Sequence, residues 1–352
     1  MKRSIRKPAP ESSVDLITLA ECVEHFATRT VVLFGDFVAD EYQFGDISRV
    51  SREAPVLILR HRETHLAPGG AANAANNLAA LGARVYPISA VGDDAAGDAL
   101  IAYFRSKNVN TSGVLRVKGW TTPTKTRILG GWAHTVGQQV LRVDREPRLP
   151  LPEAVRLQLR ERLQSRLRSA HALAVSDYGF GVASPELVQQ SLSRRKLRVP
   201  VTLDARYNLH AYAKAGMTSA TPNEAELEAM HQVSIGQDLP ELKRAGNATL
   251  ALMQLRALLV TRGRDGMALF ESGDHITQIP VYGSDQAVDV TGAGDTVLAA
   301  YTVALACGAS PLEAAHIANI AGGLVVMKRG TATVSKEELL AAIHLQAGGS
   351  AS

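Results

Sequence analysis

The sequence is poor in the residues that build disulfide scaffolds, metal centres and membrane spans. Its 352 residues include only two cysteines, Cys22 and Cys307, and it contains neither a CxxC nor an HExxH pattern, which excludes a disulfide framework and the common zinc sites. Each cysteine lies in or beside an apolar helical stretch, which favours buried thiols. No run of about 18 apolar residues occurs, and no apolar stretch follows the first basic residues, so neither a membrane span nor a signal peptide is indicated. We expect a soluble, cytoplasmic protein.

The chain also has little excess charge and lacks two common nucleotide-binding motifs. The net charge is +4, and part of it falls in residues 1–13, which we predict to form a disordered basic tail. Neither nucleic acid nor a membrane is expected as a partner. No Gly-Lys pair occurs, which excludes a P-loop, and the first expected strand ends in Gly35-Asp36-Phe37-Val38 instead of GxGxxG. A dinucleotide-dependent dehydrogenase is therefore disfavoured.

Apolar strands and helices alternate at a spacing of roughly 30 residues, as they do in βαβ proteins. This pattern predicts an α/β fold with a doubly wound, mainly parallel sheet flanked by helices. The expected strands are 30–36, 84–92, 172–177, 199–204, a short one near 217–220, 257–261 and a hairpin over 266–282. The expected helices are 14–27, 71–81, 95–107, 152–169, 184–195, one that begins at 221–224, 294–306 and 311–327. We predict one domain over residues 14–345, followed by a flexible tail over 346–352.

Two segments, 41–66 and 119–144, break this alternation and instead show an apolar–polar repeat of period two. That repeat is typical of strands with one exposed face, so we expect the segments to pair as a small antiparallel β lid. The lid carries Lys125, Arg127 and Arg142. These side chains either face solvent or point together toward an anionic substrate such as a sugar phosphate.

The stretch Gly292-Ala293-Gly294-Asp295 opens an apolar helix and is the best candidate for the reaction centre. Small residues at a helix start leave backbone N–H groups free to bind an anion, and the helix dipole adds to their pull. Beside a phosphate, Asp295 could accept the proton of an attacking hydroxyl. An ordinary turn with a helix cap explains the stretch equally well.

A second glycine-rich helix start, Gly69-Gly70 followed by Asn73, offers backbone and amide contacts to a ligand. Close helix–sheet packing is the alternative, but three asparagines make this a poor helix, which favours a function for at least one of them. Asp36 and Asp40 follow the first strand, where carboxylates either bind sugar hydroxyls or cap a turn.

Two further segments suit a nucleotide and its metal. Asn223 and Glu226 begin a helix, either as a cap or as groups that orient Mg²⁺-bound water. Thr261, Gly263 and Gly266 lie in a turn after a strand, where a backbone-lined adenine and ribose pocket is the functional alternative to a simple tight turn.

Together these motifs resemble the PfkB-type, ribokinase-like carbohydrate kinases over about residues 30–340. The family's two signatures match in order and separation, at Gly69-Gly70-x-x-Asn73 and Asp289-x-Thr291-Gly292-Ala293-Gly294-Asp295. Within the family the chain is most similar to the heptose 7-phosphate kinases of lipopolysaccharide core synthesis. The stretches that carry this likeness are 48–56, 68–73, 123–127, 138–144, 176–178 and 329–335.

The resemblance implies an ATP- and Mg²⁺-dependent kinase that phosphorylates the anomeric hydroxyl of D-glycero-β-D-manno-heptose 7-phosphate. Asp295 would be the base and Gly292, Ala293 and Gly294 the anion hole. The other implied roles are the sugar site at Asp36, Gly69, Gly70 and Asn73, the metal and phosphates at Asn223 and Glu226 (the metal through water), and the nucleotide at Gly263 and Gly266. The alternatives are a kinase for another sugar or sugar phosphate, and a non-catalytic nucleotide or sugar sensor.

Two departures from the family pattern matter. Asp204-Ala205-Arg206 stands where many relatives have Asp-Pro-Lys, so Arg206 is expected to replace a lysine near the phosphates. Many relatives also continue into a nucleotidyltransferase domain, and no His-x-Gly-His is present here, so we expect the bisphosphate to be the product. A homodimer through the lid and a monovalent-cation site near residues 285–291 are further expectations.

Overall fold

The main sheet of the protein places its strand ends at one edge, where the predicted site residues gather. The computed structural model describes residues 14–131, 138–192, 199–273, 275–283 and 287–349; the predicted tail over 1–13 lies outside them. The nine strands of this sheet run in the order β13-β12-β11-β10-β9-β8-β1-β4-β5. They are β1 (Thr30–Gly35), β4 (Arg84–Gly92), β5 (Val114–Val117), β8 (Ala172–Asp177), β9 (Val201–Ala205), β10 (Ser219–Ala220), β11 (Ala257–Thr261), β12 (Met267–Glu271) and β13 (His275–Ile279). From β11 to β5 all neighbours are parallel, and β12 and β13 add an antiparallel edge.

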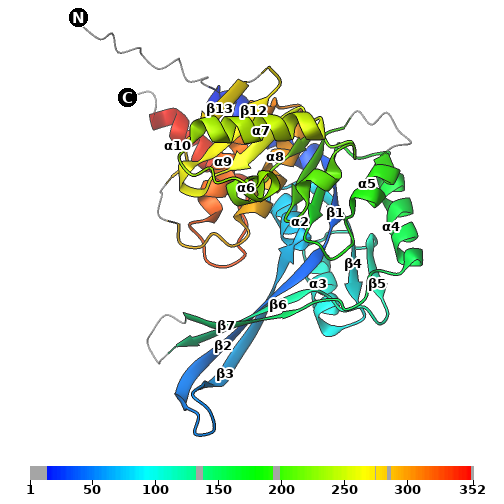
Figure 1. Cartoon of the computed structure of the whole chain (residues 1–352), viewed down its shortest axis with the longest axis vertical. Helices are drawn as coiled ribbons and strands as arrows, with labels where there is room; N and C mark the ends of the chain where they lie inside the picture. The colour runs from blue at the N-terminus through cyan, green and yellow to red at the C-terminus, as the bar shows by residue number, and fades with distance from the viewer. Residues whose placement is uncertain (1–13, 132–137, 193–198, 274, 284–286, 350–352) are drawn as a thin grey trace, which may run out of the picture.

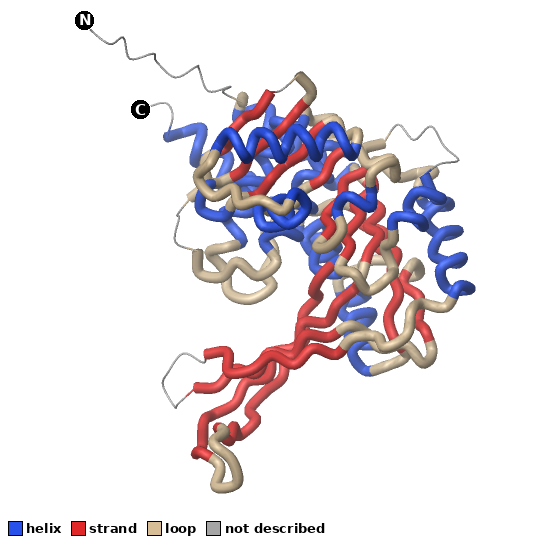
Figure 2. Tube along the Cα trace, in the orientation of Figure 1, coloured by secondary structure: helices blue, strands red, loops and turns tan. Residues whose placement is uncertain are grey.

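Helices cover both faces of this sheet because successive strand residues point to opposite sides. Val31 and Leu33 join one buried cluster, whereas Val32 and Phe34 join the other. The first cluster packs under α1 (Leu16–Glu24), α2 (Ala71–Ala80), α3 (Ala95–Ser106), α8 (Ala293–Ala306), α9 (Pro311–Val325) and α10 (Lys336–Gly349), and the second under α4 (Glu153–Arg166), α5 (Pro185–Leu192), α6 (Glu224–His231) and α7 (Leu239–Met253). Figure 2 shows the strands enclosed by these helices. The predicted doubly wound α/β fold is confirmed.

A separate four-stranded sheet, the lid, projects from the body (Figure 1). It consists of β2 (Phe37–Val50), β3 (Leu57–Gly70), β6 (Thr124–Gly131) and β7 (Gln138–Arg145), in the order β3-β2-β6-β7. Both hairpins are antiparallel, as predicted, but β2 and β6 pair in parallel. The difference arises because both strands run outward from the main sheet. Residues 132–137 of the predicted segment lie outside the described residues.

Three elements form where none is predicted, namely β5, α7 and α10. Helix α10 is fixed by Leu339 and Ile343, which are fully buried one helical turn apart. It extends through Gly349, so residues 346–349 continue a helix instead of starting the predicted flexible tail. Among all the helices that the structure describes, none is both long and apolar enough to cross a bilayer.

Candidate active site

Asp295 lies in the first turn of α8 and is held between two donors from other elements. Its side chain is almost completely buried. One oxygen accepts a hydrogen bond from the Asn73 amide at 2.9 Å, and the other accepts one from the Tyr178 hydroxyl at 3.0 Å. Three segments distant in the sequence therefore meet at this carboxylate. The arrangement fixes the orientation that a general base needs before a substrate arrives.

The asparagines of α2 are buried and each has a partner, so packing alone does not explain them. Asn77 donates to Asn73 and accepts a hydrogen bond from Thr296, and Asn76 accepts one from Tyr103. Buried amides are tolerated when their donors and acceptors are satisfied. The network thus fixes the Asn73 amide toward Asp295.

Glycines at two positions allow these elements to approach. Gly292 has a φ of +79°, and a Cβ there would collide with the Asn73 amide nitrogen. Gly70 has a φ of +56°, and its Cβ would lie 2.8 Å from a methyl group of Val38 and 2.9 Å from the Asp36 carbonyl oxygen. Residues with a side chain rarely adopt such φ values. Both glycines are therefore required by the backbone that carries Asn73 and Asp295.

Asp36 has a different role from the sugar binding predicted for it. Its carboxylate accepts hydrogen bonds from the backbone N–H groups of Tyr178, Phe180 and Val182, at 2.8 to 3.1 Å. Burial, and then the neighbouring Asp177, raises the pKa of Asp36 to about 7. Both oxygens are engaged within the protein because the loop after β8 has buried donors that need an acceptor. Asp36 therefore positions Tyr178, and this arrangement does not support direct contact with a sugar.

The lid supplies two cations with different surroundings. Arg127 forms a largely buried ion pair with Asp40, the shortest N–O distance being 2.6 Å. Gly69 lies against this pair, since a Cβ there would stand 2.5 Å from an oxygen of Asp40. Asp40 and Arg127 thus neutralise each other and are tied together as part of the lid.

Lys125 has no ion-pair partner among the described residues and lies over the ring of Tyr178, 5.3 Å from its centroid. Arg206 lies 5.9 Å from the same centroid. Burial, and then the Arg206 charge, lowers the pKa of Lys125. Arg142, by contrast, is exposed and pairs with Asp144 on its own strand at 2.9 Å. Lys125 and Arg206 are therefore the cations best placed to receive an anion beside Asp295.

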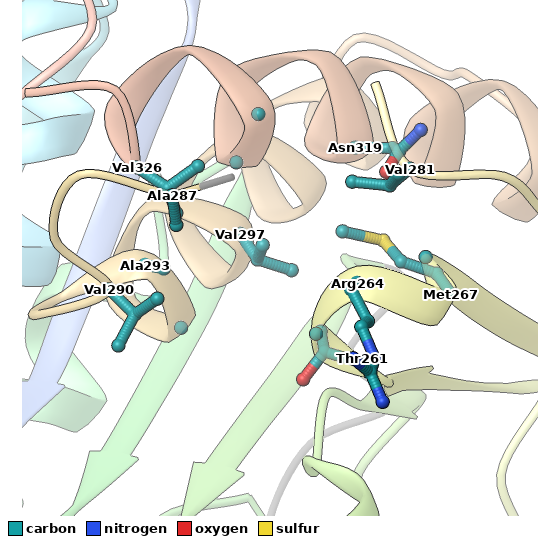
Figure 3. Close-up of a pocket in the computed structure, with 15 residues that line it drawn as sticks. Thr261, Arg264, Met267, Val281, Ala287, Val290, Ala293, Val297, Asn319 and Val326 are labelled. Carbon is teal, nitrogen blue, oxygen red and sulfur yellow. The ribbon is translucent and has the colours of Figure 1, made fainter. Parts of the chain in front are cut away.

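A cavity of about 190 Å³ opens on the other side of the α8 N-terminus (Figure 3). Thr261, Gly263, Gly266, Ala293 and Gly294 line it, so the structure brings together the predicted nucleotide and anion-hole residues. The remaining lining is mostly apolar and includes Met267, Val281, Val290, Val297 and Val326. A flat apolar group such as a purine base fits a cavity of this character.

Asn223 and Glu226 form a reciprocal capping box at the start of α6. The Asn223 oxygen accepts from the Glu226 N–H at 2.8 Å, and Glu226 accepts from the Asn223 N–H at 2.9 Å. The cap is thus sufficient to account for these residue types. Glu226 also acts on the half-buried Asp204, because desolvation and then the Glu226 charge raise the pKa of Asp204 well above its usual value.

The family model of the pfkB family carbohydrate kinases matches residues 29–338 of this chain. The chain belongs to this family. Among its curated relatives, the bifunctional protein HldE of Geobacter metallireducens is 38% identical over 323 residues, which cover 92% of this chain and 64% of the relative. HldE of Magnetococcus marinus is 38% identical over 324 residues, with coverage of 90% and 64%. This pfkB chain therefore spans about 64% of the length of these relatives.

Solved structures of similar fold include two sugar kinases. Phosphofructokinase-2 from Escherichia coli in complex with potassium has a TM-score of 0.73 and 21% identity, covering 91% of this chain and 99% of that one. Arabidopsis thaliana ribokinase with ribose and ATP has a TM-score of 0.67 and 22% identity, covering 90% and 98%. These likenesses show that this pfkB chain has the ribokinase-like fold.

Two residues of this pfkB chain have no predicted role. Tyr178 donates to Asp295 and contacts both Lys125 and Arg206. Asn319 lines the cavity and donates to the Pro280 carbonyl oxygen at 2.7 Å. A sequence signal exists for each of them. Tyr178 directly follows a strand that ends in Asp177, and Asn319 interrupts the apolar face of a helix. Part of the predicted monovalent-cation segment, residues 285–286, lies outside the described residues.

The pH dependence of a pfkB kinase with this site should follow Asp295. Burial raises the pKa of Asp295 to about 7, although Asn73 and Tyr178 act in the opposite direction. A base must be deprotonated to accept a proton, so kcat/KM should rise with pH through about 7 and fall about tenfold per pH unit below it. Initial rates at low sugar concentration, measured from about pH 5 to pH 9, give this profile. A flat profile below pH 7 would contradict the assignment.

Proposed function

We propose that this protein is an ATP-dependent kinase that transfers the γ-phosphoryl group of ATP to the anomeric hydroxyl of D-glycero-β-D-manno-heptose 7-phosphate. The products would be the 1,7-bisphosphate and ADP. The observation that carries the proposal is the buried Asp295, which is held by Asn73 and Tyr178. It lies between an apolar cavity and two cations, Lys125 and Arg206, that form no ion pair with any residue the structure describes. The similarity to HldE proteins over most of the chain supports the choice of this subfamily.

Asp295 would accept the proton of the sugar hydroxyl while the hydroxyl oxygen forms a bond to the γ-phosphorus of ATP. The bond from that phosphorus to the bridging oxygen breaks, and ADP leaves. Charge on the transferred group would fall near the N-terminal turn of α8, where Ala293 and Gly294 have no bulky side chains. The backbone N–H groups of this turn would stabilise the transition state of phosphoryl transfer, because positioning and charge stabilisation dominate this chemistry.

The 7-phosphate of the sugar substrate would bind Lys125 and Arg206. Both cations contact the Tyr178 ring, whose hydroxyl donates to Asp295, so an anion held by them lies in the same part of the site as the base. The 7-phosphate is at the end of the sugar away from the anomeric carbon, so the body of the sugar would span the distance to Asp295. Binding an anion would also relieve the repulsion between these two cations. A sugar phosphate meets this requirement better than a neutral sugar does.

The residues near Arg206 suit a magnesium ion held mainly through water. Across the described part of the chain no three His, Cys, Asp or Glu side chains converge as direct ligands. Glu226 and Asp204 offer two carboxylates instead, and Mg²⁺ commonly keeps several waters and uses few protein ligands. When bound there, the ion would neutralise charge on the ATP phosphates.

The proposal is tested by measuring ADP formation with three acceptors, namely heptose 7-phosphate, fructose 6-phosphate and ribose. We expect the highest kcat/KM with the heptose phosphate. A higher value with fructose 6-phosphate or ribose would assign the chain to another sugar of the same family. Binding of ATP or sugar with no ADP formed from any acceptor would show a sensor.

We also propose that two copies pair through the lid. Side chains alternate along the lid strands, so one face carries Lys125, Arg127 and Arg142. The opposite face carries Leu141 and Val143. These two residues and Val140 are each more than two-fifths exposed. Near Gly130, Ile47 and Leu59 join Val140 on that second face. An exposed apolar sheet face of this kind favours association with an identical surface.

Leu141→Asp should convert a dimer into a monomer, because it places a charge in the middle of the apolar face. Sedimentation velocity measures the change directly. Arg142→Ala, which alters the neighbouring residue on the opposite face, is the matched control and should remain dimeric. A wild-type chain that sediments as a monomer at micromolar concentration would refute the pairing.

A further inference from the structure

The chain's two cysteines line the same surface cavity at the end of α8 that lies farthest from Asp295. Cys22 belongs to α1, and Cys307 caps the C-terminus of α8. The Cys22 sulfur lies 3.9 Å from the carbonyl oxygen of Ala304, in the last turn of α8. Both thiols are free and partly exposed. They therefore form a pair accessible to a reagent in solution.

This pair lines a surface cavity of about 330 Å³. The cavity is lined by Thr18, Glu21, Cys22, His25, Cys307, Gly308, Ala309 and Glu313. Along α8, Asp295 and Cys307 are separated by twelve residues, which corresponds to roughly 18 Å at the helical rise. The cavity is therefore distinct from the proposed kinase site, and its chemistry does not depend on the proposed function.

The two thiols differ in reactivity. The hydrogen bond from Cys22, and then the Arg29 guanidinium, lowers the pKa of Cys307 to about 7. The same contact with Cys307, together with burial, raises the pKa of Cys22. The Arg29 Nε is buried and, within the described residues, has no hydrogen-bond partner in the protein. Cys307 thus has the features of an attacking thiolate, with Cys22 beside it as the second thiol.

We propose that Cys307 and Cys22 form a dithiol site that reacts with low-molecular-weight disulfides to give an intramolecular disulfide. The Cys307 thiolate attacks one sulfur of the small disulfide, forming a mixed disulfide and releasing the first small thiolate. Cys22 then loses its proton and attacks the Cys307 sulfur, which releases the second small thiol. The protein is oxidised by two electrons, and the small disulfide is reduced to two thiols.

The experiment treats the reduced full-length chain with oxidised glutathione in the absence of oxygen and measures the intact mass after an acid quench. We expect wild type to lose two hydrogen atoms and to retain no glutathione, with Cys22 and Cys307 joined in one peptide pair after digestion. Cys22→Ser should retain one glutathionyl group on Cys307, because no second thiol can displace it. Cys307→Ser should react more slowly than Cys22→Ser.

Stable glutathione on wild type without the loss of two hydrogen atoms would overturn the proposal, because the two thiols would then be unable to join. The proposal would also be overturned if wild type stayed unmodified under conditions in which oxidised glutathione reacts with an exposed thiol of a control protein. Should one serine variant fail to fold, as judged by circular dichroism, the wild-type mass and peptide map still decide the outcome. Kinase assays of Cys22→Ser report separately on the proposed function, which fails or stands independently of this chemistry.

Discussion

Asp295→Asn should lower kcat by at least about 100-fold, the usual scale for loss of a general base. An amide at this position keeps the size of the carboxylate and can accept from Asn73 while its NH2 donates to the Tyr178 oxygen, but it cannot accept a proton from the sugar hydroxyl. The KM for ATP should change little, because the nucleotide cavity lies on the other side of the helix start. Steady-state kinetics with saturating sugar phosphate measure the effect.

The matched variant is Tyr178→Phe, which removes one hydrogen bond to Asp295 but leaves the carboxylate itself. We expect its kcat to fall much less than that of Asp295→Asn. Thermal unfolding and ATP binding of both variants establish that the fold is intact. Near-normal turnover by a folded Asp295→Asn protein would remove Asp295 from the mechanism.

Lys125→Ala should raise the KM for the sugar phosphate by roughly 10- to 100-fold, which corresponds to loss of a charged hydrogen bond. Lys125 has no ion-pair partner within the described residues and stands beside the Tyr178 ring. A substrate phosphate would therefore supply a direct ion-pair partner for Lys125, which Asp40 and Asp144 influence only from a distance. The KM for ATP should stay close to the wild-type value, and full kinetics with each substrate varied in turn distinguish the two effects.

Arg142→Ala provides the control, because Arg142 is exposed and already paired with Asp144. Its effect should be small, as exposed ion pairs contribute little. A second comparison uses the same sugar without its phosphate, for which Lys125→Ala and wild type should have similar KM values. Equal losses for Lys125→Ala and Arg142→Ala would place the substrate phosphate elsewhere on the lid.

The sequence was sufficient to predict the alternation of most strands and helices of the body and the two glycine-rich helix starts, but not β5, α7 or α10. Periods of two and of about 3.6 residues distinguish the lid from the body, and glycine marks positions such as Gly292 where only one residue type suits the backbone. Helix α10 was not predicted, because its apolar residues are buried only through packing against α9 and against α1, which is distant in the sequence. Local pattern carries no information about such distant partners.

The roles of individual polar side chains were harder to predict than their positions. Asp36 and Asp40 both follow the first strand, yet one accepts backbone N–H groups and the other pairs with Arg127. Lys125 and Arg142 lie on neighbouring strands of one lid face, yet only Arg142 has an ion-pair partner among the described residues. These distinctions depend on which groups the fold brings within about 3 Å, and sequence spacing does not specify them.

The two hydrogen bonds to Asp295 bear on the rate of ATP hydrolysis when no sugar is present. Each oxygen of this carboxylate already holds a donor, Asn73 or Tyr178. A water molecule can still reach a remaining lone pair of the carboxylate, but it brings few other contacts to hold its oxygen in line with the γ-phosphate. A sugar phosphate brings several. We therefore expect ATP hydrolysis in the absence of sugar to be slow even with the lid open, because selectivity against water rests on how many contacts position the attacking oxygen.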